Sequence, residues 1–190
     1  GHTIQSAYLG FGLSITSEAS DRENEGWMSN DAEKNHHLIL TKPLGTGAIL
    51  AAFKQGKTSG STLEEAINVM LLSNQKAFEI LKQHPVRACT DVSGFGFLGH
   101  LQEMLNQSLG SRYELQLDLE NIPVLPAAKK LLESGVESHI AYSNETFVRT
   151  FSHQFLQTHL PNFYTTLDFR ILLDPQTSGG LLLSLIHISE

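Results

Sequence analysis

The sequence contains little cysteine, fewer basic than acidic residues and no long apolar run. Cys89 is the single cysteine among 190 residues, which excludes an intramolecular disulfide. The 13 Lys and Arg against 20 Asp and Glu give a formal net charge of -7, which disfavours non-specific binding to a nucleic-acid backbone. No apolar run approaches the roughly 20 residues that cross a bilayer, and no secretory signal is visible. We therefore expect neither a nucleic-acid nor a membrane partner.

What the sequence does contain is enough apolar material for a folded core. Hydrophobic residues make up 41% and charged residues 17%, which is typical of a globular protein. The 9 histidines are scattered and show no zinc-ligand spacing. The chain starts at Gly1 and ends at Glu190 just after an apolar run. We therefore expect a piece of a longer protein, with one domain and a remnant of another.

A change in composition marks a candidate domain boundary. Residues 8–15 alternate apolar with small or polar side chains, as a short strand does. Residues 18–35 then collect Glu, Asp, Ser and Asn, and we interpret them as an interdomain linker. After the linker, residues 36–40 are predicted to form a strand that leads into a glycine-bearing turn at residues 41–47.

Helical periodicity is clearest over residues 61–83. Ser61 followed by Glu64 has the pattern of a capping box, and Pro85 stops further helix. Apolar side chains at three- and four-residue spacing predict one buried stripe. The stripe consists of Leu63, Ile67, Met70, Leu71, Phe78 and Leu81.

Strands and helices alternate along the rest of the chain without a fixed repeat. The fold class expected is therefore mixed α/β or α+β, a sandwich of a sheet and helices. Predicted helices cover residues 98–109 and 126–134, the second ending before Gly135, and predicted strands cover 86–90, 113–119, 171–173 and 180–186.

A glycine-rich segment at residues 90–101 is the first candidate for chemistry. Asp91 stands where a predicted strand ends and a glycine loop begins. A carboxylate in that place can bind magnesium beside a nucleotide, because Mg²⁺ takes one or two carboxylates together with phosphate oxygens. The same carboxylate can instead cap the turn by accepting a hydrogen bond from a backbone N–H two residues on. The residues alone leave both interpretations open.

The same segment also matches a dinucleotide-binding fingerprint. Gly94, Gly96 and Gly99 have the spacing Gly-x-Gly-x-x-Gly after a strand and before a helix, and Asp118 follows at about the distance of a ribose-binding acid. A glycine loop before a helix serves turns and close packing equally well. The preceding strand is short and ends at Asp91, which disfavours NAD binding.

Three further features carry weaker signals. Residues 174–182 contain Asp-Pro and Gly-Gly and predict either a ligand-facing loop or a tight connection between two buried strands. Cys89 is next but one to a carboxylate, which opposes thiolate formation, so we interpret it as a small buried hydrophobe. The small and hydroxyl residues of the segment that begins at Gly1 could touch phosphate.

Three segments together resemble one enzyme family. Residues 40–47, 90–101 and 174–182 closely resemble, in order and spacing, motifs of the selenophosphate synthetases, or selenide, water dikinases. The resemblance implies the two-layer sandwich of mixed sheet and helices found in the carboxy-terminal domain of aminoimidazole ribonucleotide synthetase. Residues 1–17 would then be the last part of an amino-terminal ATP-binding and dimerisation domain. Residues 36–190 would form a carboxy-terminal domain truncated at its end.

The resemblance also implies an activity. Members of the family transfer the γ-phosphoryl group of ATP to selenide and release AMP and phosphate, with Mg²⁺, as cytoplasmic homodimers joined through their amino-terminal domains. Gly1, His2 and Thr3 match the end of a segment that contacts the nucleotide, and Asp91 matches a magnesium-coordinating aspartate. The family's catalytic lysine and its cysteine or selenocysteine would lie upstream of Gly1, and Cys89 does not match that cysteine. No catalytic residue is therefore expected in this chain, which we expect to be inactive alone.

Two alternatives to an enzyme part follow from the same features. One is a non-catalytic module that keeps the fold and binds ATP or metal, suggested by the missing amino-terminal half and the acidic linker. The other is an NAD-binding domain built on Gly94, Gly96 and Gly99. Retention of a nicotinamide cofactor would favour the second, and selenide-dependent ATP consumption would favour the enzyme.

Overall fold

A three-stranded sheet lies at the centre of the part of the chain that the computed structural model describes, residues 36–105, 117–152 and 162–186. The strands are β1 (His36–Leu40), β2 (Val86–Asp91) and β3 (Leu181–Ile186), in the order β1-β3-β2. Both neighbours pair antiparallel with β3, with Leu40 opposite Leu182 and Asp91 opposite Leu181. The predicted α+β class of sheet and helices is confirmed.

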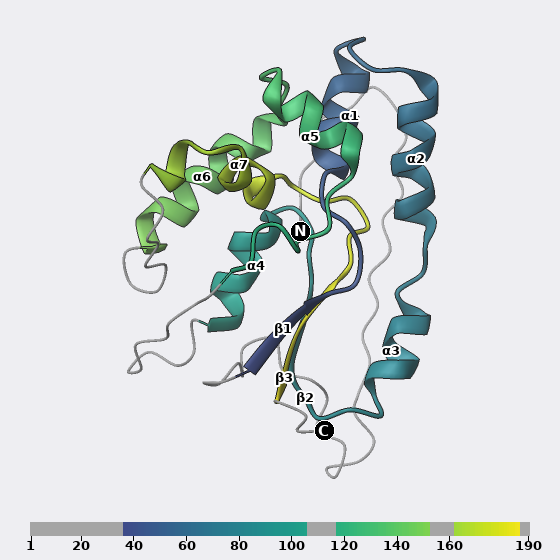
Figure 1. Cartoon of the computed structure of the whole chain (residues 1–190), viewed down its shortest axis with the longest axis vertical. Coiled ribbons are helices and arrows are strands. Elements are labelled where there is room, and N and C mark those ends of the chain that lie inside the picture. The colour runs from purple at the N-terminus through teal and green to yellow at the C-terminus, as the bar shows by residue number, and fades with distance from the viewer. Residues whose placement is uncertain (1–35, 106–116, 153–161, 187–190) are drawn as a thin grey trace, which may run out of the picture.

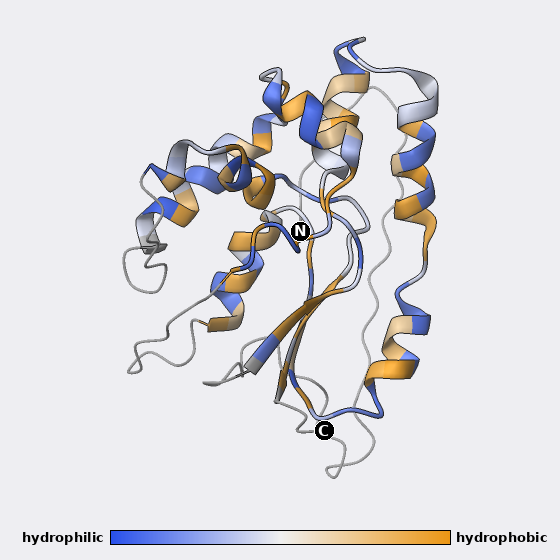
Figure 2. Ribbon diagram, viewed as in Figure 1, coloured by the Kyte–Doolittle hydropathy of each residue, from blue (hydrophilic) through white to orange (hydrophobic). Residues whose placement is uncertain are grey.

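The central strand β3 buries side chains on both faces, which explains its nearly continuous apolar sequence. Leu182 belongs to the main core, whereas Leu183 and Leu185 belong to a second, smaller cluster with Leu81. Because successive strand residues point to opposite faces, the two clusters lie on opposite sides of the sheet. The strands are mostly orange in Figure 2, as expected of a sheet covered on both sides.

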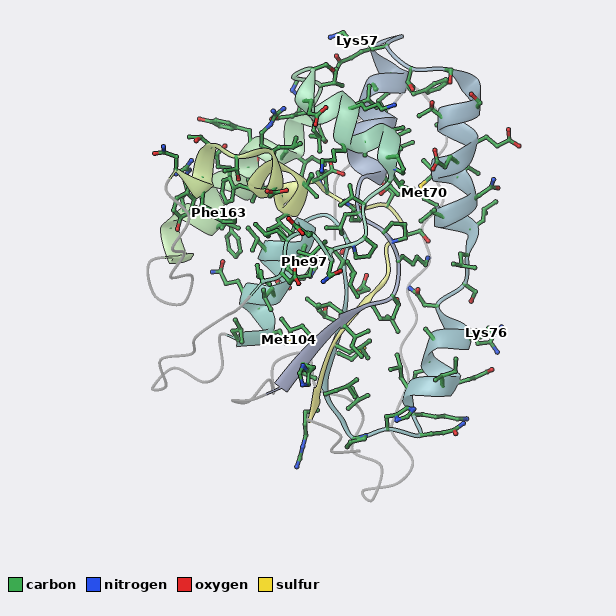
Figure 3. All side chains as sticks on the ribbon, in the orientation of Figure 1. Lys57, Met70, Lys76, Phe97, Met104 and Phe163 are labelled. Carbon is green, nitrogen blue, oxygen red and sulfur yellow. The ribbon has the colours of Figure 1, made fainter. Side chains whose placement is uncertain are left out.

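Most helices contribute to the main core on one side of the sheet. They are α1 (Thr46–Lys54), α4 (Gly96–Leu105), α5 (Pro126–Glu133), α6 (His139–Ser152) and α7 (Leu167–Leu173), the last preceded by the 3-10 turn η1 (Phe163–Thr165), and Ala66 of α2 (Gly60–Leu71) joins the same core. Figure 1 shows α4, α6 and α7 on the side of the sheet away from α2 and α3 (Gln75–Leu81). Figure 3 places Phe97 and Met104 of α4 and Phe163 of η1 among the elements on that side. All three side chains are buried, which fixes α4 against the sheet.

The predicted helix over residues 61–83 is wrong in three respects. It is two helices, α2 (Gly60–Leu71) and α3 (Gln75–Leu81). The N-cap is Ser59, whose hydroxyl accepts from the Thr62 backbone N–H, in place of the expected capping box at Ser61. The predicted buried stripe is largely exposed, since Leu71 is 77% and Phe78 50% accessible while Leu81 is buried.

The break between α2 and α3 has a local cause. The Ser73 hydroxyl accepts from the Gln75 backbone N–H, and the Asn74 side chain donates to the Gly179 carbonyl at 3.0 Å. Side-chain bonds of this kind compete with helix propagation. The break also ties the two helices to the loop that follows α7.

Two predicted strands require correction. Residues 171–173 are the last turn of α7, which Thr166 caps by accepting from the Phe169 backbone N–H. A short apolar run is compatible with a strand or with a buried helix. Here the Thr166 cap and the buried side chain of Phe169 stabilise the helix. Residues 117–119, the described end of the predicted strand 113–119, are irregular, and the remainder lies outside the described residues.

Five other described elements agree closely with the sequence predictions. β1, β2, β3 and α5 begin and end within one residue of the predicted bounds, and α4 begins two residues before the predicted 98. The helices α1 and α6 were not predicted, and α1 begins inside the predicted turn at residues 41–47. Gly135 has a φ of 83° after α5, as a helix-ending glycine does. Within the described residues, no helix has the length and apolar character to cross a bilayer.

Candidate functional site

The three glycine-bearing segments singled out in the sequence meet at one end of the sheet. Because β1 and β2 run antiparallel to β3, the ends of β1 and β2 lie beside the start of β3. The Thr41 N–H donates to the Leu181 carbonyl at 3.0 Å, and the Val92 N–H donates to the Gly180 carbonyl at 2.9 Å. Residues 41–47, 90–101 and 174–182 therefore form one structural unit, although the first and last are more than 120 positions apart.

Gln176 joins the loop after α7 to the start of α1. Its side-chain oxygen accepts from the backbone N–H groups of Gly45 and Thr46 at 3.0 and 3.2 Å and from the Thr46 hydroxyl at 3.1 Å. The Thr177 N–H returns a bond to the Thr46 hydroxyl oxygen at 3.0 Å. These bonds satisfy helix N–H groups that have no partner within α1. The first turn of α1 is thereby occupied by protein and is closed to a ligand.

Asp174 is a second buried polar group in the same junction. Its Oδ2 accepts from the Gly47 N–H at 3.1 Å and from the Gln176 side-chain nitrogen at 3.0 Å, while its Oδ1 is buried without a hydrogen-bond partner. Burial raises the pKa of Asp174 to about 7, against hydrogen bonds from the backbone of α1 and from Gln176 that lower it. The carboxyl group is thus poised between its neutral and ionised forms near neutral pH.

Close backbone contacts explain the glycines of the junction. A Cβ on Gly47 would overlap the Pro175 carbonyl oxygen and lie 2.7 Å from the Asp174 Oδ1, and one on Gly179 would overlap the Val92 carbonyl oxygen. The small residues therefore allow the loop to lie directly against its neighbours. This is the packing role that the sequence left open for residues 174–182, here between a helix and a strand.

Lys42 is buried at the same junction. Its ammonium donates to the Ser178 carbonyl at 2.9 Å, and burial lowers its pKa. Ser178 has a φ of 50° and donates its hydroxyl to the Met70 carbonyl at 2.7 Å. The loop is therefore tied to β1 on one side and to α2 on the other.

Asp91 differs from these buried groups because its side chain is exposed. It is the last residue of β2, and within the described residues its carboxylate makes no hydrogen bond or ion pair. The turn-capping bond considered from the sequence is therefore not formed there. A free carboxylate at this edge can bind a cation.

Asp91 is the one metal-ligand candidate that the sequence placed in this segment. Within the described residues there is no group of three or more His, Cys, Asp and Glu side chains that could hold a metal ion. One protein carboxylate fits Mg²⁺ that takes its other oxygens from phosphates, water and residues elsewhere. Gly1, His2 and Thr3, the predicted nucleotide-binding residues, lie outside the described residues.

Cys89 is half-buried and packs against the smaller apolar cluster. Burial, together with the negative charge of Asp91, raises the pKa of its thiol to about 11. At neutral pH the side chain is a thiol, which is a poor nucleophile. The structure thus supports no nucleophilic role for Cys89.

The dinucleotide-binding interpretation finds no support in the arrangement of β2. Such a site needs parallel strands joined through the helix, whereas β2 pairs antiparallel with β3. A Cβ on Gly96 would lie 2.8 Å from the Leu173 carbonyl oxygen, so this glycine serves packing. Asp118, the candidate ribose-binding acid, lies in an exposed turn and accepts from the Asn121 side chain.

A group of polar side chains behind Asp91 escaped the sequence analysis. His100 of α4 is 5% exposed, with Nε2 3.1 Å from the Ser93 hydroxyl and Nδ1 3.0 Å from the Glu103 carboxylate. Asn144 of α6 donates to the carbonyls of Gly94 and Leu173. The spacing of His100 and Glu103 on a predicted helix was the one signal that could have revealed the group.

Curated relatives with similar sequences carry one name. The chain is 34% identical over 184 residues to the selenide, water dikinase of Treponema denticola, which covers 97% of this chain and 49% of that protein. It is 36% identical over 187 residues to the protein of the same name from Campylobacter jejuni, covering 97% of this chain and 50% of that protein. The chain therefore spans about half the length of the curated relatives it matches.

A solved structure supports the fold at lower similarity. Thiamine-monophosphate kinase from Stenotrophomonas maltophilia matches with a TM-score of 0.51 at 15% identity, over 86% of this chain and 43% of that one. The model of the family described as AIR synthase related protein, C-terminal domain, matches residues 33–158. With a match over most of its length, the chain belongs to the family of AIR synthase related proteins, as their carboxy-terminal domain.

Proposed function

We propose that this chain supplies the second domain of a selenide, water dikinase and that Asp91 is the magnesium ligand of that domain. The reaction would convert ATP, selenide and water to selenophosphate, AMP and phosphate. The observation that carries the proposal is the exposed carboxylate of Asp91, which has no partner among the described residues, at the meeting point of three segments that are bonded to one another. The similarity to proteins named selenide, water dikinase supports ATP and selenide as the substrates proposed.

The chain's part in such a reaction is positioning. Phosphoryl transfer depends mainly on placing the reacting groups and neutralising phosphate charge, and Mg²⁺ supplies that neutralisation when bound. The backbone of Asp91 is held by its pairing with Leu181, and the next residue donates to the Gly180 carbonyl. The carboxylate therefore projects from a fixed strand end while its oxygens stay free for a ligand.

The remaining parts of the site would come from outside the described residues. We propose that Gly1, His2 and Thr3 contact the nucleotide, as the end of an ATP-binding domain that includes residues 1–17. Residues 18–35 would link that domain to residues 36–190. The whole protein would act in the cytoplasm as a homodimer joined through the amino-terminal domains, with ATP and selenide as substrates.

The direct test uses the protein extended upstream of Gly1. We expect ATP consumption that depends on selenide and yields AMP. ATP binding without any selenide-dependent AMP would favour the non-catalytic module and overturn the proposal.

A substitution then tests the metal ligand separately. Asp91→Asn removes the charge at nearly constant volume and should lower the rate about a hundredfold at a fixed Mg²⁺ concentration, with partial recovery at higher Mg²⁺. Asp118→Asn, which removes an exposed carboxylate from a turn, is the matched control. An unchanged magnesium dependence in Asp91→Asn would remove Asp91 from the site.

A further inference from the structure

Ser93, His100 and Glu103 form a chain of hydrogen bonds that begins two residues after Asp91. Ser93 lies in the loop between β2 and α4, and the two other residues belong to α4. The Ser93 hydroxyl is 3.1 Å from His100 Nε2, and His100 Nδ1 is 3.0 Å from the Glu103 carboxylate. The three side chains thus have the order hydroxyl, imidazole, carboxylate, in which an acid orients an imidazole and the imidazole orients a hydroxyl.

The carboxylate determines which way these bonds run. An ionised carboxylate only accepts hydrogen bonds, so Nδ1 of His100 carries the proton that is donated to Glu103. In the neutral ring Nε2 then has a lone pair and accepts from the Ser93 hydroxyl. The O–H of Ser93 is therefore directed at His100, and its oxygen lone pairs are left for another donor.

The position of Ser93 is fixed by its surroundings. Its backbone carbonyl accepts from the N–H groups of Gly96 at 3.1 Å and Gln176 at 2.9 Å. The Phe95 ring lies with its centroid 5.7 Å from that of His100 and covers the imidazole. The backbone of Ser93 is consequently held by two hydrogen bonds, and its hydroxyl is held by the buried ring of His100.

Ser93 is also close to Asp91 in the chain. Val92 is fully buried, whereas Asp91 is exposed and Ser93 half-buried. The bond from the Val92 N–H to the Gly180 carbonyl continues the pairing of β2 past Asp91. The oriented oxygen of Ser93 thus belongs to the segment that leaves the strand end at which Asp91 is proposed to hold magnesium.

We propose that Ser93 orients the water molecule that the reaction consumes, and that His100 and Glu103 hold its hydroxyl in the required direction. The proposal rests on the proposed function. In that reaction one phosphoanhydride bond is broken by selenide and the other by water. The water oxygen bonds to phosphorus, the electron pair of the broken P–O bond goes to AMP, and of the two water protons one stays on the phosphate and the other goes to solvent. Ser93 would accept a hydrogen bond from that water as it attacks, which is a positioning contribution.

The bond directions can be tested on the 190-residue chain without any activity. Nitrogen-15 NMR of the histidine rings should show His100 with its proton on Nδ1 and an unprotonated Nε2. Ser93→Ala should shift the Nε2 resonance, whereas Ser143→Ala, which removes an exposed hydroxyl from α6, should leave it in place. A proton on Nε2, or an Nε2 resonance that ignores Ser93→Ala, would overturn the proposal.

The role in the reaction is tested by product ratios in the protein extended upstream of Gly1. If water attack is slowed while selenide attack continues, ADP is released in place of AMP. Ser93→Ala should lower AMP formation about tenfold relative to selenophosphate, the effect of one lost hydrogen bond, and Ser93→Thr should restore it by returning the hydroxyl. Glu103→Gln should have a smaller effect because Glu103 is 46% exposed at its side chain.

The outcomes separate this inference from the proposed function. A wild-type protein that makes no AMP with selenide would refute the dikinase, whatever the NMR result. An active wild type whose ratio of AMP to selenophosphate is unchanged by Ser93→Ala would refute the role of Ser93 and leave the dikinase standing. A fall in both products to the same extent, with no recovery in Ser93→Thr, would show a merely structural role and also overturn the inference.

Discussion

The buried carboxyl group of Asp174 should make the stability of this domain depend on pH. Asp174 is 1% exposed, and its pKa is raised from 3.8 to about 7, mainly by burial. In the unfolded chain the group has its ordinary pKa, so it ionises there at a lower pH than in the folded chain. The folded state therefore binds the proton more tightly than the unfolded state does.

The sign and size of the effect follow from this difference. A raised pKa in the folded state means that the stabilisation by Asp174 is complete below pH 3.8 and is lost as the pH rises toward about 7. At about 1.4 kcal/mol for each pKa unit, the total loss is about 4 kcal/mol. About half of it, roughly 2 kcal/mol, falls between pH 5 and pH 7.

Asp174→Asn isolates this contribution because it keeps an oxygen that can accept from the Gly47 N–H but cannot ionise. The free energy of unfolding is measured with urea at several pH values from 5 to 8. The free energy of unfolding of the variant minus that of the wild type should increase by about 2 kcal/mol from pH 5 to pH 7. Asp118→Asn controls for the loss of a surface charge. A difference between variant and wild type that stays constant over this range would refute a buried, raised pKa at Asp174.

Two further predictions concern the same end of the sheet. Gln176→Ala removes the acceptor of three buried donors at the start of α1 and should lower the free energy of unfolding by about 3 kcal/mol in urea titrations, with Gln83→Ala as the exposed control. If Gln176→Ala lowered the free energy of unfolding by less than Gln83→Ala does, the result would contradict the hydrogen bonds from Gly45 and Thr46 to Gln176. Cys89, with a thiol pKa raised to about 11, should react with iodoacetamide at pH 8 about a hundredfold more slowly than an ordinary thiol. Asp91→Asn should speed that reaction, and a wild-type rate equal to that of free cysteine would speak against the raised pKa.

Elements with strong local signals were predictable from the sequence. The apolar run of β3 and the Pro and Gly that bound α5 carry their own information, because they depend on residues close in the chain. Leu98, Leu101 and Met104, at helical spacing within the predicted helix over residues 98–109, are all buried in α4. In each case a local preference and the tertiary packing agree.

The errors arose where distant residues decide the local structure. The helix predicted over residues 61–83 breaks at Asn74 because its side chain bonds to Gly179, which is 105 positions away. The apolar stripe suggested burial, but Leu71 and Phe78 are exposed among the described residues. Periodicity shows that a helix has an apolar side and cannot show what covers it.

The sequence predicted which segments form the candidate site, but not which of their side chains are structural and which are free to bind a ligand. Motif density singled out residues 41–47, 90–101 and 174–182, and the structure brings them together. Which polar side chains are structural depends on burial and on partners up to 140 positions apart, such as Thr41 and Leu181. The hydrogen bonds of Ser93 and His100 were missed because no spacing rule links a loop serine to a histidine seven residues later.

Burial divides the polar residues of these segments into two groups with different consequences for function. The first group consists of the buried side chains of Lys42, Asp174 and Gln176. Their hydrogen bonds go to other residues of the protein and hold the three segments together. The second group consists of Asp91 and Ser93. Asp91 is exposed and has no partner in the described part of the chain. Ser93, two residues later, donates its hydroxyl to His100, which leaves the lone pairs of the Ser93 oxygen unoccupied. Substitutions in the first group should therefore act on stability, and substitutions in the second on chemistry. Asp91 and Ser93 supply one carboxylate and one oriented hydroxyl to the proposed nucleotide site, and we expect its other ligands to come from elsewhere in the protein, as in an active site shared between two domains.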